Sequence, residues 1–500
     1  MRVGRGKGLE AGAWLLSRVS VACAVTLTVC GWVAWTSREG TASRFGLLAL
    51  GCLVTAAVAG RSGPDWRSVR PGDLLTAAIL AACGGIAIST CVYVVVGFDG
   101  GLVGAFFESV AGVTTTATSV ASDPEALGRG VLLWRAATQW LGGLGYLLLV
   151  VLVIPFLGLG DAPRRKVGAV AAGLIPGSKR ARRLALTYGA AYSVLTLAGA
   201  VVFRIVGMGT FDAITYAATT ISSGGFGNHA GSFGHFRDPA IEWAGAGGML
   251  LAGMSMPLLV ATFRGERSLL RSVELRAYLG IVVVSTLLVA GWRSTGNFDV
   301  DTVRSSAVAV TSMVSTTGHY AQSWGGWPES AQLVLLLLAG LGSMAGSVGG
   351  GFRIRRAMVV TRLVSRDVRK AIHPRRVVSV SVGEDVIGEE LGSRIAGFQA
   401  MLLVVTSMTA FALAVAGADL LTSVSGAVSA VSTTGVGLGD LAPGRGGVGS
   451  LSWPGLLAIA AAAFVGRLEM YPVFGALVSA WVAVGRLARG VVARALAGLG

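Results

Sequence analysis

Charged residues are scarce in this chain of 500 residues. Asp, Glu, Lys and Arg together make up 13% of it, whereas hydrophobic residues make up 53% and the mean hydropathy is +0.70. A soluble protein of this size needs a far more polar surface, so the composition excludes that class. Apolar runs recur along the whole length, and several exceed the roughly 20 residues that span a hydrocarbon core. The sequence therefore predicts an all-α membrane protein.

Cysteine and histidine are also few, and each shortage removes a class of function. The cysteines show neither disulfide-framework nor zinc-knuckle spacing, so we expect packing thiols at Cys23, Cys30, Cys52, Cys83 and Cys91. The apolar runs hold no paired carboxylates, no His-Glu-x-x-His pattern and no Ser/His/Asp set, which argues against an enzyme. His229 and His235 lie in a polar segment without a supporting Cys or carboxylate cluster, which favours a solvated loop over a metal site.

Positive charge is the one polar feature in excess, with a net charge of +16. It lies in short clusters between the apolar runs, unlike the basic domain with interleaved aromatic residues that binds nucleic acid. By the positive-inside rule, these clusters and the N-terminus are cytoplasmic. The clusters lie at 61–70, 164–183, 264–276, 353–376 and 486–494.

Similar motifs of threonine, serine and glycine recur roughly every hundred residues, a period unlike that of short solenoid repeats. They read TTTATS (114–119), ISSGGF (221–226), STTGH (315–319) and STTGV (432–436), and we call them the Thr/Ser–Gly motifs. Each ends a semi-polar segment of about a dozen residues that is too short to span a membrane. Because each segment lies between two apolar helices, the predicted unit is helix, pore loop, helix.

Four such units account for most of the chain. We expect two N-terminal transmembrane helices in residues 1–72 and the first unit in 73–160. A basic linker and the second unit occupy 161–263, the third unit 264–363, and a cytoplasmic linker, the fourth unit and a basic tail 364–500. Non-helical backbone at membrane depth is tolerated only where it is buried in protein or lines a cavity. The units therefore predict one shared, water-accessible centre.

The chemistry of the Thr/Ser–Gly motifs indicates a site for a monovalent cation. A half-helix that stops at mid-membrane directs the partial negative charge of its last carbonyls to the centre. Hydroxyls add neutral oxygens, and a following glycine permits the backbone angles that turn carbonyls inward. Without a carboxylate, such a site suits K⁺ better than Ca²⁺ or Mg²⁺. The predicted ion-binding residues are Thr115, Thr116, Ala117, Ser223, Gly224, Gly225, Thr316, Thr317, Gly318, Thr433, Thr434 and Gly435.

The alternative is that these small residues only allow close helix packing, but four equivalent copies argue against it. Two other features stand out. The glycine-rich stretch 342–351 should unwind, since each glycine costs a helix about 1 kcal/mol relative to alanine, and it lacks the lysine of a phosphate-binding loop. Arg467 lies inside the last apolar run, where a charge usually faces a pore or a partner; a pair with Glu469 or an interfacial position is the alternative.

The chain resembles the Trk/Ktr/HKT superfamily of potassium transporters, and the TrkH type most closely. The similarity covers about residues 73–486. It rests on FESVAGVTTTATS, WRAATQWLGGLGYLLLVVLVIPFLG, TTISSGGF, SMVSTTGH, GSMAGSVGGGFRIRR, HPRRVVSVSVGEDVIGEE, STTGVGLG and GRLEMYP. It implies four M1-P-M2 units (helix, pore loop, helix) related by a pseudo-fourfold axis around one pore. It also implies a homodimer and a cytoplasmic RCK-type regulatory subunit that binds nucleotide.

The resemblance further implies potassium uptake across the bacterial inner membrane, with K⁺ bound in a selectivity filter and no organic cofactor in this chain. Arg467 corresponds to an arginine near the permeation path below the filter. The glycine-rich stretch corresponds to a gating loop whose serine hydroxyls face the ion. The residues of that loop are Gly342, Ser343, Gly346, Ser347, Gly349, Gly350 and Gly351.

The sequence departs from the family pattern at two places. Ala117 replaces the filter glycine of the first motif, which leaves open a sodium-permeable or poorly selective transporter, or a non-conducting sensor subunit. His319 stands where phenylalanine is commoner, so both a response to external pH and a packing role are open.

Overall fold

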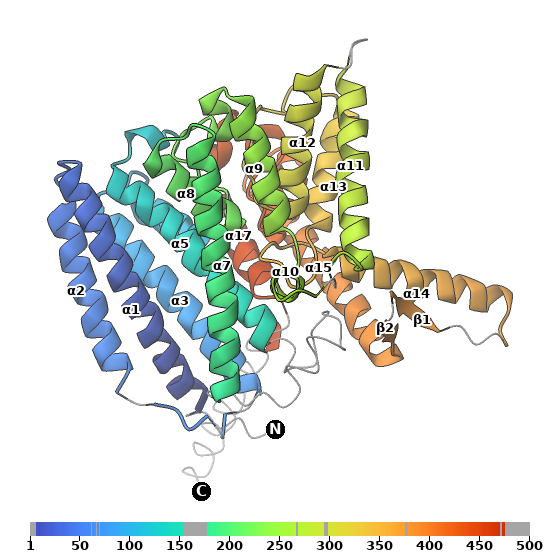
Figure 1. Cartoon of the computed structure of the whole chain (residues 1–500), viewed down its shortest axis with the longest axis horizontal. Helices are drawn as coiled ribbons and strands as arrows, with labels where there is room; N and C mark the ends of the chain where they lie inside the picture. The colour runs from blue at the N-terminus through green and yellow to red at the C-terminus, as the bar shows by residue number, and fades with distance from the viewer. Residues whose placement is uncertain are drawn as a thin grey trace, which may run out of the picture.

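Long apolar runs form the membrane-length helices of the computed structural model (Figure 1). The structure describes residues 7–153, 178–470 and 473–475, apart from 62, 67, 70, 267–268, 295–298, 376–378 and 384. Within these ranges seven helices are long and apolar enough to cross a membrane, or eight if one bent pair counts as a single span. The basic residues predicted at 164–166 and 486–494 lie outside the described residues.

Two N-terminal helices, α1 (Lys7–Thr36) and α2 (Ala42–Ala59), pack against each other and against α3 at one side of the molecule (Figure 1). Their lipid-facing positions are aliphatic and aromatic, and the shared core includes Leu27, Phe45 and Tyr93. The prediction of two helices ahead of the first unit is confirmed.

Each of the four units contains a short middle helix between two outer helices. The middle helices, which we call the pore helices, contact both outer helices of their own unit. Unit one comprises α3 (Pro71–Val96), α4 (Gly101–Val113) and α5 (Arg129–Leu148) with the π-helical turn η2 (Leu149–Val153). Unit two comprises α7 (Lys179–Ile205), α8 (Thr210–Ile221), α9 (Pro239–Ala252) and α10 (Met256–Phe263). Unit three comprises α11 (Val273–Arg293), α12 (Val300–Ser315), α13 (Glu329–Leu341) and α14 (Ile354–Ile372), and unit four α15 (Glu389–Val415), α16 (Leu420–Val431) and α17 (Trp453–Arg467).

Contacts between units follow the same order around a closed ring. The helix after each pore helix packs against the pore helix of the next unit: α5 against α8, α9 against α12, and α13 against α16. The ring closes because α17 of unit four packs against α4 of unit one. This arrangement confirms the predicted pseudo-fourfold architecture.

The second long helix is broken in three of the units. In unit two, α9 and α10 meet at 99°, where Ser255 and Pro257 start a new helix. In unit three, α13 ends at Leu341, where the glycine-rich stretch begins. In unit four, α17 ends at Arg467, and Glu469 and Met470 follow with positive φ angles of 59° and 49°. Of these three breaks, only the one in unit three was predicted from the sequence.

Short elements complete the described chain. The 3₁₀ turns η1 (Pro124–Ala126), η5 (Ser232–Phe236), η6 (Gly439–Leu441) and η7 (Gly447–Ser450) follow the motifs of units one, two and four. The strands β1 (Val380–Val382) and β2 (Asp385–Ile387) pair antiparallel, with Ser381 opposite Val386. This hairpin packs on α14, which runs away from the bundle near the base of α11 (Figure 1).

Candidate functional site

All four pore helices end in the same hydrogen-bonded turn. An amide donates to the carbonyl five residues earlier, as Thr116 does to Ala111 at 2.8 Å, the pattern of a Schellman-type cap. The equivalent donors are Gly224, Thr317 and Thr434, at 2.8, 3.0 and 2.9 Å. The residue before each donor is left-handed: Thr115 (φ 53°), Ser223 (49°), Thr316 (57°) and Thr433 (58°). Such a conformation costs a residue with a Cβ on the order of 1–3 kcal/mol and points to a functional constraint.

The four Thr/Ser–Gly motifs meet at one centre. A Cβ built on Gly225 would collide with the carbonyl oxygen of Thr317, one on Gly318 with that of Thr434. A Cβ on Gly435 would collide with the backbone of Ala117. Each motif therefore lies against a neighbouring one, and the predicted ion-binding residues of all four units are brought together. Backbone atoms approach each of these glycines closely because glycine has no side chain in the way.

Ala117 departs from the other three residues at its position. Gly225, Gly318 and Gly435 have φ angles of 76°, 83° and 84°, whereas Ala117 is not among the described residues with positive φ. Its methyl carbon lies 2.6 Å from where a Cβ on Gly225 would be. The first motif therefore takes a different backbone path and places a methyl group where the others place none.

The hydroxyl groups of the motifs differ in what they bind. Those of Thr115, Ser223 and Thr433 are buried and have no hydrogen-bond partner. The hydroxyl of Thr316 instead accepts from the backbone amide of Gly350 at 2.8 Å. A buried polar group without a partner is uncommon. Three unpaired oxygens at equivalent positions are therefore available to a ligand.

Gln139 of α5 joins unit one to the motif of unit two. Its side-chain amide donates to the carbonyl of Gly224 at 2.7 Å, and its side-chain oxygen accepts from the amide of Phe226 at 3.0 Å. Gln139 is fully buried. Gln139 was not predicted as a site residue from the sequence, although a polar amide side chain within an apolar run indicates a buried hydrogen-bonding role.

A buried ion pair stabilises the backbone just beyond these motifs. Arg135 Nε lies 2.8 Å from Glu108 Oε1, and both side chains are at most 2% exposed. Glu108 also accepts from the hydroxyl of Ser119 at 2.9 Å and the amide of Val120 at 3.1 Å. Arg135 donates to the carbonyl of Gly227 at 3.2 Å. The pair therefore fixes the chain that leaves the first motif and the chain that leaves the second.

Side chains of units two and three likewise form hydrogen bonds to the motif of the next unit or to the residue after it. His319 contacts the hydroxyls of Ser232 at 3.0 Å and Thr219 at 3.1 Å through its two ring nitrogens, and it stacks on Tyr216. Because His319 is fully buried between these groups, the structure favours the packing role. Trp324 Nε1 donates to the carbonyl of Gly437 at 3.0 Å.

The glycine-rich stretch lies against the motifs of units three and four. Besides the bond from Gly350 to Thr316, a Cβ on Gly350 would collide with the carbonyl oxygen of Ser432, and one on Gly349 would lie 2.6 Å from that of Ser315. Gly342, Gly346 and Gly351 have positive φ angles of 71°, 79° and 83°. The hydroxyls of Ser343 and Ser347 bond each other at 2.6 Å.

Helices of units two and three also form hydrogen bonds with the glycine-rich stretch. The break between α9 and α10 bonds it twice, from Met256 N to Gly346 O at 3.0 Å and from Met344 N to Gly253 O at 3.1 Å. Glu274 of α11 accepts from the amide of Ala345 at 2.6 Å. The broken helices of units two and three therefore meet in one layer.

Arg467 completes this layer from unit four. It is 4% exposed, donates from Nη1 to the carbonyl of Val348 at 2.8 Å, and lies 3.8 Å from the ring centre of Tyr146. Its Nε and Nη2 have no hydrogen-bond partner. Glu469 instead pairs with Arg353 at 2.8 Å and Arg356 at 2.6 Å. The structure therefore places Arg467 on the glycine-rich stretch.

Known proteins share this architecture and parts of this sequence. The model of the TrkH family, described as cation transport proteins, matches residues 96–480. The chain is 31% identical over 379 residues to the Trk system potassium uptake protein TrkG of Escherichia coli (strain K12), covering 74% of this chain and 76% of that protein. It is 30% identical over 347 residues to TrkH of the same strain, covering 68% and 71%. The crystal structure of the potassium transporter TrkH from Vibrio parahaemolyticus shares the fold, with a TM-score of 0.85, 24% identity and coverage of 94% of this chain and 98% of that one.

Replacing Glu108 by glutamine should destabilise the protein strongly. The change leaves the buried guanidinium of Arg135 without its counter-charge, which typically costs about 3–5 kcal/mol. Thermal unfolding of the purified protein in detergent measures the effect. The matched control is Glu390→Gln, because Glu390 forms an exposed pair with Arg394 at 2.6 Å and exposed pairs contribute little. Equal melting temperatures of the two variants would contradict the role assigned to the buried pair.

Proposed function

The chain belongs to the TrkH family of cation transport proteins, and on this premise we propose that it carries K⁺ into a bacterial cell across the inner membrane. One observation supports this function above the others. Four Thr/Ser–Gly motifs meet at one centre, which offers backbone carbonyls and unpaired hydroxyls, and the motifs themselves contain no carboxylate. Neutral oxygens at close range can replace the hydration shell of K⁺, whereas Mg²⁺ and Ca²⁺ need carboxylates or retained water.

The pore helices would supply the electrostatic part of this site. Each ends at the centre with its C-terminal carbonyls, and a helix C-terminus carries roughly half a negative charge. This charge attracts a cation without binding it as tightly as a fixed carboxylate would. An ion can therefore enter and also leave, as conduction requires.

The glycine-rich stretch would act as a gate beneath this filter. Two contacts support this role. The stretch packs against the carbonyl oxygens of Ser315 and Ser432, and the amide of Gly350 donates to the hydroxyl of Thr316, whose three equivalents are unpaired. Arg467 bonds the same stretch at Val348 and adds a positive charge that opposes a cation there. The pathway would open when the stretch withdraws and the hydroxyl of Thr316 is released.

The expected partners, a nucleotide-binding RCK-type regulatory subunit and a second copy of this chain, need a cytoplasmic surface. The helix α14 offers one, since it leaves the bundle and carries the exposed side chains Val364, Val368 and Ile372 at four-residue spacing. It begins at Ile354, directly after the glycine-rich stretch. A subunit that moves α14 would therefore pull on the gate.

A sodium-permeable or poorly selective transporter is the second candidate, and Ala117 favours it. One of the four motifs lacks the left-handed glycine and carries a methyl group at the centre. Fewer inward carbonyls would discriminate less between K⁺ and Na⁺. The third candidate function, a non-conducting sensor subunit, is supported by the same residue, Ala117.

Ion flux distinguishes these functions. The protein, reconstituted in vesicles with and without its regulatory subunit, should show saturable Rb⁺ uptake that excess K⁺ inhibits and Na⁺ does not. It should also restore growth on low K⁺ to a bacterium that lacks K⁺ uptake systems. Na⁺ uptake of similar rate would support the second candidate. No flux from a folded protein under any of these conditions would overturn the transport proposal.

The substitution Ala117→Gly should increase discrimination between K⁺ and Na⁺ by about ten-fold, equivalent to about 1.4 kcal/mol. Glycine can adopt the left-handed conformation of the other three motifs, and it removes the methyl group. The ratio of Rb⁺ to Na⁺ uptake measures the effect. Ala121→Gly, the same change beyond the motif, is the control. An unchanged or lower ratio for Ala117→Gly would refute this role.

The substitution Gly350→Ala should raise uptake because its Cβ would collide with the carbonyl oxygen of Ser432 when the stretch is closed. Each 1.4 kcal/mol lost from the closed state raises the open population about tenfold while that population is small. The control is Gly340→Ala in α13, where a Cβ meets only a methyl carbon of Val428 at 3.5 Å. Equal uptake rates of both variants would argue against a gate at this position.

A further inference from the structure

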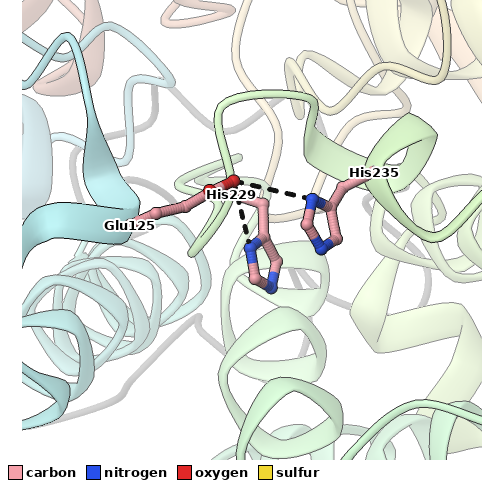
Figure 2. Close-up of side chains that lie close together, drawn as sticks. All are labelled: Glu125, His229 and His235. Carbon is pink, nitrogen blue, oxygen red and sulfur yellow. Dashed lines mark hydrogen bonds and ion pairs between the residues drawn. The ribbon is translucent and has the colours of Figure 1, made fainter.

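Three potential metal ligands from two units meet in the outer loops (Figure 2). Glu125 lies in η1, which follows the first motif, whereas His229 and His235 follow the second motif, the latter in η5. Glu125 Oε1 is 3.3 Å from His229 Nδ1 and 3.5 Å from His235 Nδ1. One ligand atom from each of the three lies within 4.8 Å of the other two. The carboxylate that the sequence analysis did not find near the histidines is therefore supplied from 104 positions away.

The spacing fits a tetrahedral metal centre. With metal–ligand bonds of about 2.0–2.2 Å, the donors of a tetrahedral zinc site lie roughly 3.3–3.6 Å apart. Both distances from Glu125 Oε1 fall in this range. The two imidazole rings are parallel, with centres 3.6 Å apart, and both direct Nδ1 toward the same carboxylate oxygen (Figure 2). For the three donors to share one ion, at least one ring must tilt out of this parallel stack, because a ligating nitrogen directs its lone pair within the plane of its ring.

A second carboxylate lies near one of the histidines. Asp212 Oδ1 lies 3.6 Å from Nε2 of His229, and the same oxygen accepts from Asn228 at 2.7 Å. At this distance Asp212 forms no hydrogen bond with the ring, but its negative charge lies beside the cluster. A cation bound there would therefore have two carboxylates near it.

We propose that Glu125, His229 and His235 bind a divalent transition-metal ion at the outer face, with Zn²⁺ as the best fit. Two imidazoles and one carboxylate are typical zinc ligands, whereas Mg²⁺ and Ca²⁺ prefer oxygen alone. The side chains of Glu125, His229 and His235 are 47%, 21% and 41% exposed, which leaves room for a water as the fourth ligand.

Such an ion would link the outer loops of units one and two. His229 is separated from Gly225 of the second motif by three residues, and Ser232 in η5 bonds His319 of the third motif. Binding would therefore stiffen the outer mouth of the pathway, and the inference extends beyond the K⁺ transport proposed above.

Binding of Co²⁺ to the purified full-length protein in detergent tests the site, because tetrahedral Co²⁺ absorbs visible light and Zn²⁺ displaces it. We expect a saturable absorption band in the unmodified protein and its loss in His229→Ala and His235→Ala. Glu125→Gln should weaken binding by about ten-fold or more, because it replaces the charged ligand with a neutral one. Zn²⁺ should raise the melting temperature of the unmodified protein but not that of the histidine variants.

The matched control is His373→Ala, which removes an exposed histidine at the far end of α14 and should leave the band intact. The proposal is overturned if the unmodified protein gives no saturable band. It is also overturned if the band persists in both His229→Ala and His235→Ala, or if only His373→Ala removes it. Melting temperatures without metal establish that each variant is folded.

Discussion

Non-helical backbone at the centre of a membrane protein must find its hydrogen bonds within the protein, and here each unit supplies them to the next. Gln139 of unit one bonds Gly224 and Phe226 in the second motif. Ser232 of unit two bonds His319 of the third motif, and Trp324 of unit three bonds Gly437 after the fourth. Because lipid offers no partners, the motifs can hold their strained conformations only inside the complete ring. The centre at which the motifs meet is therefore a property of the assembled units and not of any single motif.

The same dependence continues in the layer formed by the glycine-rich stretch and the broken helices around it. Helices of units two, three and four break at one level, and the broken ends bond one another through Gly253, Val348 and Arg467. A straight helix cannot present backbone amides and carbonyls sideways, whereas these ends can. The motifs and the glycine-rich stretch thus use one principle, in which interrupted helices exchange the hydrogen bonds that they lose internally.

Much of this architecture could be predicted from the sequence, because helix length, the repeat and the Thr/Ser–Gly motifs are local patterns. The break at Gly342 was predictable for the same reason, since glycine disfavours helix wherever it stands. The partners of Gln139 and of Glu108 were not, because their contacts join positions far apart in the chain. The same holds for the pairing of Glu125 with His229, where each residue alone looks like an ordinary polar loop residue.

The contact between α17 and α4 has a consequence for how the protein is made. Of the helices that close the ring, α17 leaves the ribosome last, after all four pore helices have been synthesised. Until it docks, the first pore helix lacks its neighbour from the fourth unit. A nascent chain therefore completes the ring of units only once this last helix has been synthesised.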